Sequence, residues 1–333
     1  MKIGVTYDLR DDYRALGLSE EDTAEFDAEE TIAAICDALR ALGHRPERIG
    51  GVVPLTKALA GGKRWDCVFN ICEGRHGVSR EAQVPALLEA FDIPYVFSDP
   101  LTLALALDKG LAKRVVRDAG VPVANFALID NVGDIGTVDL PFPLFLKPNS
   151  EGSGKGVDVR SRVDDAAALD RVARDLLARF RQPVLVEEYL PGREFTVGIA
   201  GTGEEARVLG VMEIVPGETF IGHGYGLENK EGWDGKLTLH RAVDDAAREA
   251  AGVALVAWRV LRCRDGGRCD IRQGADGRAR FIEVNPLAGI RPGYSDLCFI
   301  AEFEGLTYRQ LIGLFLDSFL RRHPELAQKI AAQ

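Results

Sequence analysis

The sequence predicts an α/β protein whose later part changes to an α+β arrangement. In the first hundred residues, short apolar segments alternate with segments of helical periodicity, a pattern typical of a parallel sheet covered by helices. Further on, a glycine-rich hairpin and several consecutive strands replace this alternation. A chain of 333 residues is long enough for two or three domains. We expect these domains at residues 1–103, 104–194 and 195–333.

The first domain is expected to contain three strands and the helices that cover them. Apolar segments predict strands at residues 3–7, 67–71 and 94–97, and helical periodicity predicts helices at 29–42, 82–90 and 101–120. Asp27 and Glu30 would form a capping box at the start of the helix expected at 29–42, and Gly43 would end that helix.

A hairpin opens the region that follows. We expect its strands at residues 142–147 and 157–160, with a glycine-rich tip between them. Further strands are expected at 184–187, 195–200, 207–215, 268–272 and 280–285, and helices at 164–180, 244–261 and 308–322.

Charge and cysteine content exclude several classes of protein. The net charge is −10, from 41 Lys and Arg against 51 Asp and Glu, which makes binding to nucleic acid or to an anionic membrane surface a poor expectation. The chain has neither a run of 18 apolar residues nor an apolar leader, and none of its six cysteines forms a C-x-x-C pair. We therefore expect a cytoplasmic protein with reduced thiols and no structural zinc site.

Glycine is in excess, with 36 residues, about 11% against a usual ~7%. The segment after the first strand, Thr6 to Arg10, lacks the dinucleotide-binding glycine pattern, and Gly154-Lys155-Gly156 lacks the hydroxyl residue of a P-loop. Two interpretations of the glycine-rich tip remain open. It folds over a polyphosphate through free backbone N–H groups, or it is a plain flexible turn.

The strongest local pattern lies on the two expected strands near residues 270 and 283. Side chains two residues apart share one face of a strand, so Arg268 and Asp270 would point the same way, as would Glu283 and Asn285. Two carboxylates and an amide oxygen are suitable Mg²⁺ ligands. The alternative is a surface hairpin with an ion-pair ladder. The glycine-rich tip, with Lys109 and Lys147 at element ends where amines meet phosphate well, favours the metal site.

Four ordered blocks resemble the D-alanine–D-alanine ligase family of the ATP-grasp superfamily. They are Asp108-Lys109; Lys147-Pro148 with Glu151-Gly152-Ser153-Gly154-Lys155-Gly156; Val186 to Leu190 with Gly192 to Val197; and Gly267 to Asp270 with Glu283-Val284-Asn285 and Gly289. The resemblance implies an ATP-grasp fold with an N-terminal Rossmann-like pre-ATP-grasp domain. It also implies a cytoplasmic homodimer with small-molecule substrates.

The resemblance assigns roles to individual residues. Lys109 and Lys147 would contact ATP phosphates, the chain at Glu187, Glu188 and Leu190 would hold the adenine edge, and Glu194 the ribose. Asp270, Glu283 and Asn285 would bind two Mg²⁺ ions, for which Mn²⁺ could substitute, with Asn285 also counted at the ATP site. Lys230 would reach the γ-phosphate, Arg268 and the Gly289 N–H would stabilise an oxyanion, and Ser153 is a further catalytic candidate.

The implied reaction joins a carboxylate to an amine through an acyl phosphate. The blocks around the substrates depart from the family pattern, so D-alanine is not assumed as either substrate. Candidate substrate residues are Asp27, His76, Arg291, Tyr294 and Ser295. Two alternatives remain open: an ATP-grasp enzyme with non-amino-acid or intramolecular substrates, and a degenerate nucleotide-binding protein. The loop at residues 222–235 is expected near the substrate entrance.

Overall fold

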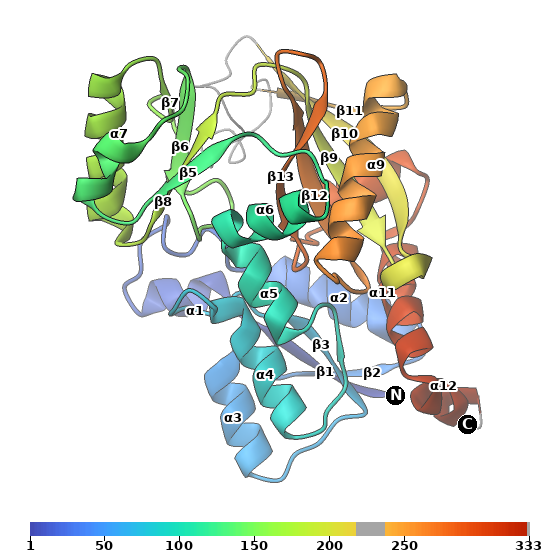
Figure 1. Cartoon of the computed structure of the whole chain (residues 1–333). Helices are drawn as coiled ribbons and strands as arrows, with labels where there is room; N and C mark the ends of the chain where they lie inside the picture. The colour runs from blue at the N-terminus through green and yellow to red at the C-terminus, as the bar shows by residue number, and fades with distance from the viewer. Residues whose placement is uncertain (218–236, 332–333) are drawn as a thin grey trace.

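Three β-sheets, with helices around and between them, account for the part of the chain that the structure describes (Figure 1). The structure is a computed structural model and describes residues 1–217 and 237–331. The expectation of mixed α and β structure is confirmed. The domain boundaries at 103 and 194 stay a prediction.

The first sheet is parallel and has the strand order β2-β1-β3-β4. Its strands are β1 (Lys2–Tyr7), β2 (Arg45–Arg48), β3 (Cys67–Ile71) and β4 (Tyr95–Val96). The helices of this part are α1 (Arg10–Ala15), α2 (Glu29–Ala41), α3 (Val52–Ala60), the 3₁₀ turn η1 (Arg80–Ala82), α4 (Gln83–Ala90) and α5 (Pro100–Leu107). The predicted parallel sheet is therefore confirmed.

The end of the chain closes the core of this first sheet. Helix α11 (Tyr308–Arg322) packs on α2, and its buried Phe315 and Phe319 join Ile32, Ile35 and Phe69 in one apolar cluster. After α11, α12 (Pro324–Ala331) lies near the N-terminus (Figure 1). Segments from the two ends of the sequence thus share a core.

The second sheet is antiparallel, with the strand order β5-β8-β6-β7. Its strands are β5 (Phe126–Ile129), β6 (Leu144–Pro148), β7 (Arg162–Val163) and β8 (Val184–Glu188), and the 3₁₀ turn η2 (Val132–Thr137) follows β5. Helix α7 (Ala166–Phe180) covers the sheet through Leu169, Val172 and Leu176.

The third sheet is also antiparallel and has the strand order β11-β10-β9-β12-β13. Its strands are β9 (Glu194–Ala200), β10 (Arg207–Pro216), β11 (Leu237–Arg241), β12 (Gly266–Gln273) and β13 (Ala279–Asn285), with the 3₁₀ turn η3 (Gly203–Glu205) between β9 and β10. Helix α9 (Asp245–Val260) packs on the face that carries Val197, and α10 (Asp296–Phe303) packs on the opposite face, against Gly198.

Helix α6 (Lys109–Asp118) connects the regions around the second and third sheets. Its buried Ala112 and Val116 join the apolar cluster of the third sheet, which includes Phe281 of β13. Its first residue, Lys109, lies beside the loop that follows β6, because the Lys109 N–H donates to the Asn149 carbonyl at 3.1 Å.

Three local predictions are wrong. The N-cap of helix α2 is Ala28, and no side chain makes a capping hydrogen bond there, so Asp27 and Glu30 form no capping box. The run at 101–120 contains two helices, because Asp108 ends α5 and its carboxylate accepts from the Leu111 N–H at the start of α6. Residues 157–160 form turns, and the second hairpin strand, β7, comes later.

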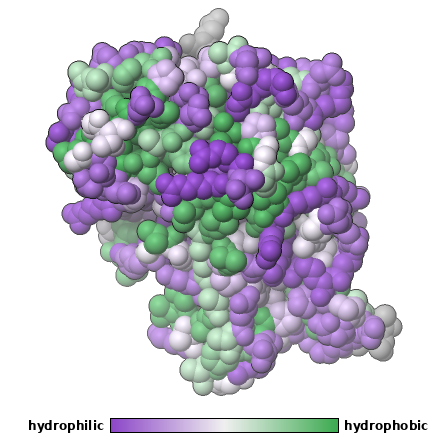
Figure 2. Space-filling model, in the orientation of Figure 1, coloured by the Kyte–Doolittle hydropathy of each residue, from purple (hydrophilic) through white to green (hydrophobic). Residues whose placement is uncertain are grey.

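Apolar residues also reach the surface. On α5 and α6, Leu101, Leu111 and Val115 are exposed, and Figure 2 shows hydrophobic residues gathered across the middle of the face seen in Figure 1. Among the helices within residues 1–217 and 237–331, none is long and apolar enough to span a bilayer.

Candidate active site

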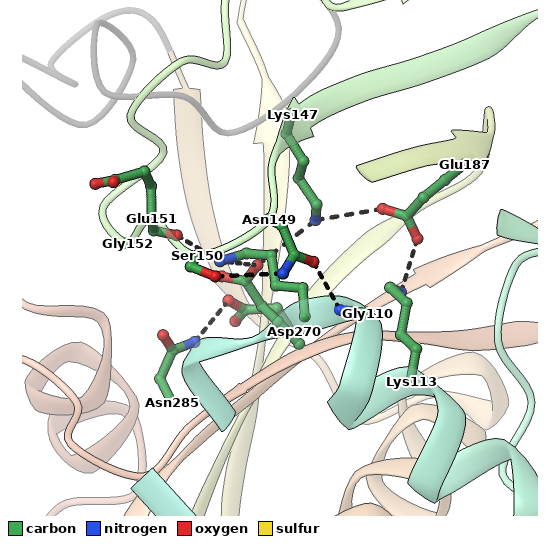
Figure 3. Close-up of polar contacts among 12 residues, drawn as sticks. Gly110, Lys113, Lys147, Asn149, Ser150, Glu151, Gly152, Glu187, Asp270 and Asn285 are labelled. Atoms are coloured by element: carbon green, nitrogen blue, oxygen red, sulfur yellow. Dashed lines mark hydrogen bonds and ion pairs between the residues drawn. The ribbon is translucent and has the colours of Figure 1, made fainter. Parts of the chain in front are cut away.

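Strands β12 and β13 place two carboxylates and an amide side by side. Asp270 lies opposite Glu283 in the antiparallel pair, and Arg268 lies opposite Asn285. The Asn285 Nδ2 donates to Asp270 Oδ2 at 3.2 Å (Figure 3). All four side chains are partly buried. The expected meeting of these residues is seen, while their role as metal ligands stays a prediction.

Asp270 is held from two sides. Arg268 Nη1 lies 2.6 and 2.5 Å from its two carboxylate oxygens, and the Thr196 hydroxyl on β9 donates to Oδ1 at 2.9 Å. Arg268 also lies 3.6 Å from the Asp296 carboxylate at the start of α10. Burial works against the charged guanidinium, but the carboxylates of Asp270, Asp296 and Glu283 raise the pKa of Arg268.

The donor set fits magnesium. Asp270 and Glu283 offer carboxylate oxygens and Asn285 an amide oxygen, and Mg²⁺ commonly takes one or two carboxylates together with substrate phosphates. No group of three or more His, Cys, Asp or Glu side chains suited to a metal occurs in the described part of the chain. With two carboxylates and one amide, phosphate oxygens would complete the coordination of a bound ion.

A row of alternating charges runs beside these carboxylates (Figure 3). Lys113 Nζ lies 2.7 Å from the Glu187 carboxylate, and Lys147 Nζ lies 3.4 Å from it. Lys147 and Lys109 in turn lie 3.6 and 3.7 Å from Glu283. These residues come from β6, β8, β13 and α6, so the row joins the second sheet to the third.

Within the row, electrostatics favour the charged forms of Lys147 and Glu187. Burial opposes the charge on Lys147, but Glu187 and Glu283 raise the pKa of its amine. Burial likewise opposes the charge on Glu187, yet Lys113 and Lys147 lower the pKa of that carboxyl. Lys113 is fully buried, which lowers its pKa, although Glu187 acts in the opposite direction. The cavity beside the row is thus lined by fixed cations.

This cavity, which we call the lysine cavity, has a volume of about 830 Å³. The expected ATP-binding residues that line it are Lys109, Lys147, Glu187, Glu188, Leu190 and Glu194. Its polar side chains are positioned by neighbours, since Asn125 Nδ2 donates to Glu188 at 2.9 Å and Arg272 lies 3.2 Å from Glu194. Asp270 and Glu283 reach the same cavity.

Two more cavities lie in series with the lysine cavity, the first next to it and the second next to the first. The central cavity, about 660 Å³, shares Lys109, Glu151 and Glu283 with it. The N-terminal cavity, about 810 Å³, shares Glu25, Ser153, Arg268 and Gly289 with the central one. Arg268 and Gly289, expected to stabilise an oxyanion, therefore line the same space as Ser153.

Most of the expected substrate residues line the N-terminal cavity, namely Asp27, Arg291, Tyr294 and Ser295. The Ser295 hydroxyl accepts from the Arg291 N–H at 2.9 Å and so ties that loop together. His76 is exposed and lines another hollow, which shares Glu25 and Phe26 with the N-terminal cavity, and its expected place beside the substrate stays a prediction. Lys230 and the loop at 222–235 fall outside the described residues.

Comparison with known proteins decides the family. Residues 115–317 match the family model described as D-ala D-ala ligase C-terminus. A D-alanine–D-alanine ligase from Xanthomonas axonopodis pv. citri is 34% identical over 293 residues, covering 86% of this chain and 88% of that protein. The chain belongs to the D-alanine–D-alanine ligase family of ATP-grasp ligases.

Two further proteins are similar to this chain. The uncharacterized protein y4sG of Sinorhizobium fredii is 32% identical over 265 residues, covering 77% of this chain and 75% of that protein. The crystal structure of D-alanine–D-alanine ligase from Bacillus anthracis has the same fold, with a TM-score of 0.73 at 23% identity, covering 98% of this chain and 99% of that one.

In this ATP-grasp ligase the glycine-rich loop is fixed rather than free. The Gly152 N–H donates to Glu25 Oε1 at 2.5 Å, and Arg80 Nη1 donates to the Ser150 carbonyl at 3.0 Å. Arg80 also pairs with Glu25 at 3.0 Å. Both interpretations of the tip, as a polyphosphate-binding loop and as a plain turn, stay predictions.

Sequence reasoning missed several residues that shape the site, namely Lys113, Thr196, Glu25, Arg80, Glu73 and Glu81. For Lys113 a signal existed. It lies four residues after Lys109, so both lie on one face of α6, and a lysine among apolar helix positions suggests a buried partner. Glu25 and Arg80 gave no local signal, because they pair across 55 positions of the chain.

Proposed function

We propose that the chain uses ATP and Mg²⁺ to join a small carboxylic acid to an amine through an acyl phosphate. One arrangement carries the proposal: Lys109 and Glu283 line both the lysine cavity and the central cavity, and Arg268 and Gly289 line the central cavity. A phosphate-binding space thus opens directly onto a space with oxyanion donors. Membership in the ligase family supports the same reaction class.

Different residues would bind the nucleotide and the metal ion. Lys109 and Lys147 would bind the phosphates of ATP, and Asp270, Glu283 and Asn285 would hold Mg²⁺, which supplies charge neutralisation when bound. A carboxylate oxygen of the acid attacks the γ-phosphorus, and the bond to ADP breaks.

The amine then attacks the carbonyl carbon of the acyl phosphate. Arg268 and the Gly289 N–H would stabilise the oxyanion of the tetrahedral intermediate, because fixed donors at a developing charge need no reorganisation. Inorganic phosphate leaves, and the amine loses a proton. The products are ADP, phosphate and an amide.

Amino acids are the proposed substrate class. The Xanthomonas relative is named a D-alanine–D-alanine ligase, and the N-terminal cavity offers both a cation, Arg291, and a carboxyl group, Asp27. The arginine could bind the carboxylate of an amino acid, and the carboxyl group could bind its ammonium. The departures in the substrate blocks, including Tyr294 near the position of an expected serine, support an acid and an amine other than two D-alanines.

The proposal is tested by ADP and phosphate release from purified protein with Mg²⁺, ATP and a panel of D- and L-amino acids, alone and in pairs. We expect release that depends on amino acids and Mg²⁺ and an amide product by mass spectrometry. ATP binding by calorimetry without ADP release for any pair would instead favour a nucleotide-binding protein.

A further inference from the structure

Two glutamates on the N-terminal side of the central cavity have no role in the reaction described so far. Glu73 follows β3 at the carboxyl end of the parallel sheet, where ligands of such sheets commonly bind. Glu81 lies in η1, a few residues further along. Both side chains line the central cavity together with Glu25, Ser153 and Gly289.

Neither carboxylate has a hydrogen bond or an ion pair within the described residues. Glu81 is only 9% exposed, yet no hydrogen bond or ion pair joins its side chain to any residue in the described ranges. The Glu73 carboxylate has no such contact either within those ranges. Buried carboxylates are normally paired or hydrogen-bonded, and no residue in the described ranges gives Glu73 or Glu81 such a partner.

The nearby cations are engaged elsewhere. Arg80 pairs with Glu25 at 3.0 Å, and Lys155 lies 2.5 Å from Glu151. Of the basic residues that line the central cavity, Lys109 lies 3.7 Å from Glu283 and donates to the Glu151 carbonyl.

Arg268 is engaged in the same way, with the carboxylates of Asp270 and Asp296. Among the described residues, the N-terminal wall of the cavity therefore has two carboxyl groups without an ion-pair partner.

The pKa values of the two glutamates are raised accordingly. Burial raises the pKa of Glu73, and the neighbouring Glu81 and Glu25 carboxylates raise it further. Burial raises the pKa of Glu81 to about 7, even though Arg80 acts in the opposite direction. A cation bound beside them would lower the pKa of both carboxyl groups.

The backbone holds the two carboxylates in a fixed relation. Gly74, next to Glu73, has a φ of +71°, and a Cβ there would lie 2.4 Å from the Arg80 carbonyl oxygen. The Gly74 N–H also donates to Asp8 Oδ2 at 2.9 Å. The turn carrying Glu73 is thus packed against the turn carrying Glu81, and the pair is formed before a ligand arrives.

We propose that Glu73 and Glu81 form a subsite for cationic nitrogen, and that the preferred acid substrate is an amino acid with a second amino group on its side chain. A single α-ammonium carries one positive charge, whereas two carboxylates have no ion-pair partner in the described part of the chain. A second ammonium balances the pair when both are ionised. This inference rests on the proposed ligase function and names the class of its acid substrate.

The test is calorimetric binding to the full chain with Mg²⁺ and a non-hydrolysable ATP analogue. The probes are both enantiomers of 2,4-diaminobutyrate and ornithine, against 2-aminobutyrate and norvaline of matched length. We expect a diamino acid to bind about tenfold or more tighter than its neutral counterpart, as for a charge-assisted pair away from water.

Variants sharpen the test. Glu81→Gln and Glu73→Gln keep the shape of a protonated carboxyl but cannot ionise, so both should abolish the preference, while Glu204→Gln, at a 97%-exposed side chain, should keep it. Equal binding of diamino and neutral probes, no binding of any diamino acid, or a preference that survives both substitutions overturns the inference.

Turnover separates this inference from the proposed function. Binding preference without ADP release for any amine contradicts the ligase function but leaves the subsite in place. Equally efficient ADP release with neutral amino acids supports the ligase function and overturns the subsite.

Discussion

Asp270 and Glu283 lie directly opposite each other on the neighbouring antiparallel strands β12 and β13. A β-irregularity follows Asp270 in this pairing, between it and Ile271. Because opposite residues in an antiparallel pair share one face, the sheet itself brings the two carboxylates together. Arg268 and Asn285 extend the same cross-strand arrangement by one further pair.

Removing either carboxylate should abolish Mg²⁺-dependent turnover. We expect Asp270→Asn and Glu283→Gln to lower kcat/KM by at least about 10²-fold, because a ligand of the ion and a neighbour of Arg268 or Lys147 are lost together. ADP release over a range of Mg²⁺ concentrations measures this. Full turnover in both variants would remove these residues from the metal site.

Arg268→Ala should lower kcat by ~10²–10³-fold and leave the KM for ATP nearly unchanged, because Arg268 lines the central cavity and is absent from the lysine cavity. Steady-state kinetics measure both constants. Arg241→Ala, at an exposed arginine paired with Glu304, is the matched control and should resemble the wild type. An unchanged kcat for Arg268→Ala would exclude Arg268 from the reaction.

Lys113→Met should destabilise the fold by about 3 kcal/mol, because it leaves the buried Glu187 carboxylate with one cation instead of two. Urea unfolding measures the free energy. Lys57→Met, at an exposed position, serves as the control. Adding Glu187→Gln should recover part of the loss, since the uncompensated charge is then gone. A loss equal to that of the control would contradict the role of Lys113.

Asp27 should make the fold less stable as pH rises. Burial and the nearby Asp8 carboxylate raise the pKa of Asp27 from 3.8 to about 7. The folded state therefore binds a proton that the unfolded state releases, and stability declines between about pH 4 and pH 7.

Between pH 5 and pH 8, the fall in the free energy of unfolding should be smaller for Asp27→Asn than for the wild type by about 3 kcal/mol, because about two pH units of the Asp27 titration lie in that range. Urea unfolding at pH 5 and pH 8 compares it with Asp37→Asn, whose side chain is 74% exposed. Identical declines in wild type and Asp27→Asn would show that Asp27 titrates normally in the folded chain.

The sequence was sufficient to predict those elements and site contacts that follow from short-range periodicity. Alternation on two strands predicted that Asp270, Glu283 and Asn285 would meet, and they do. The parallel sheet followed from the alternation of apolar strands and helices. Helix α11 was predicted with its observed bounds, Tyr308–Arg322, since its apolar spacing is regular throughout.

A break inside a continuous apolar pattern and contacts between distant segments could not be predicted. Asp108 interrupts an otherwise helical run, because its carboxylate caps α6 while the apolar pattern continues through it. The glycine-rich loop is fixed by Glu25 and Arg80, which come from the first region of the chain. The position of His76 depended on the path of its loop, which no local pattern encodes.

The central claim is that a substrate carboxylate attacks ATP to give an acyl phosphate, and ¹⁸O transfer tests it most directly. An amino acid labelled with ¹⁸O in its carboxylate is turned over with ATP and Mg²⁺, and the released phosphate is examined by mass spectrometry. We predict one ¹⁸O atom in the phosphate for each amide formed. Phosphate without label, alongside ADP release, would contradict the account.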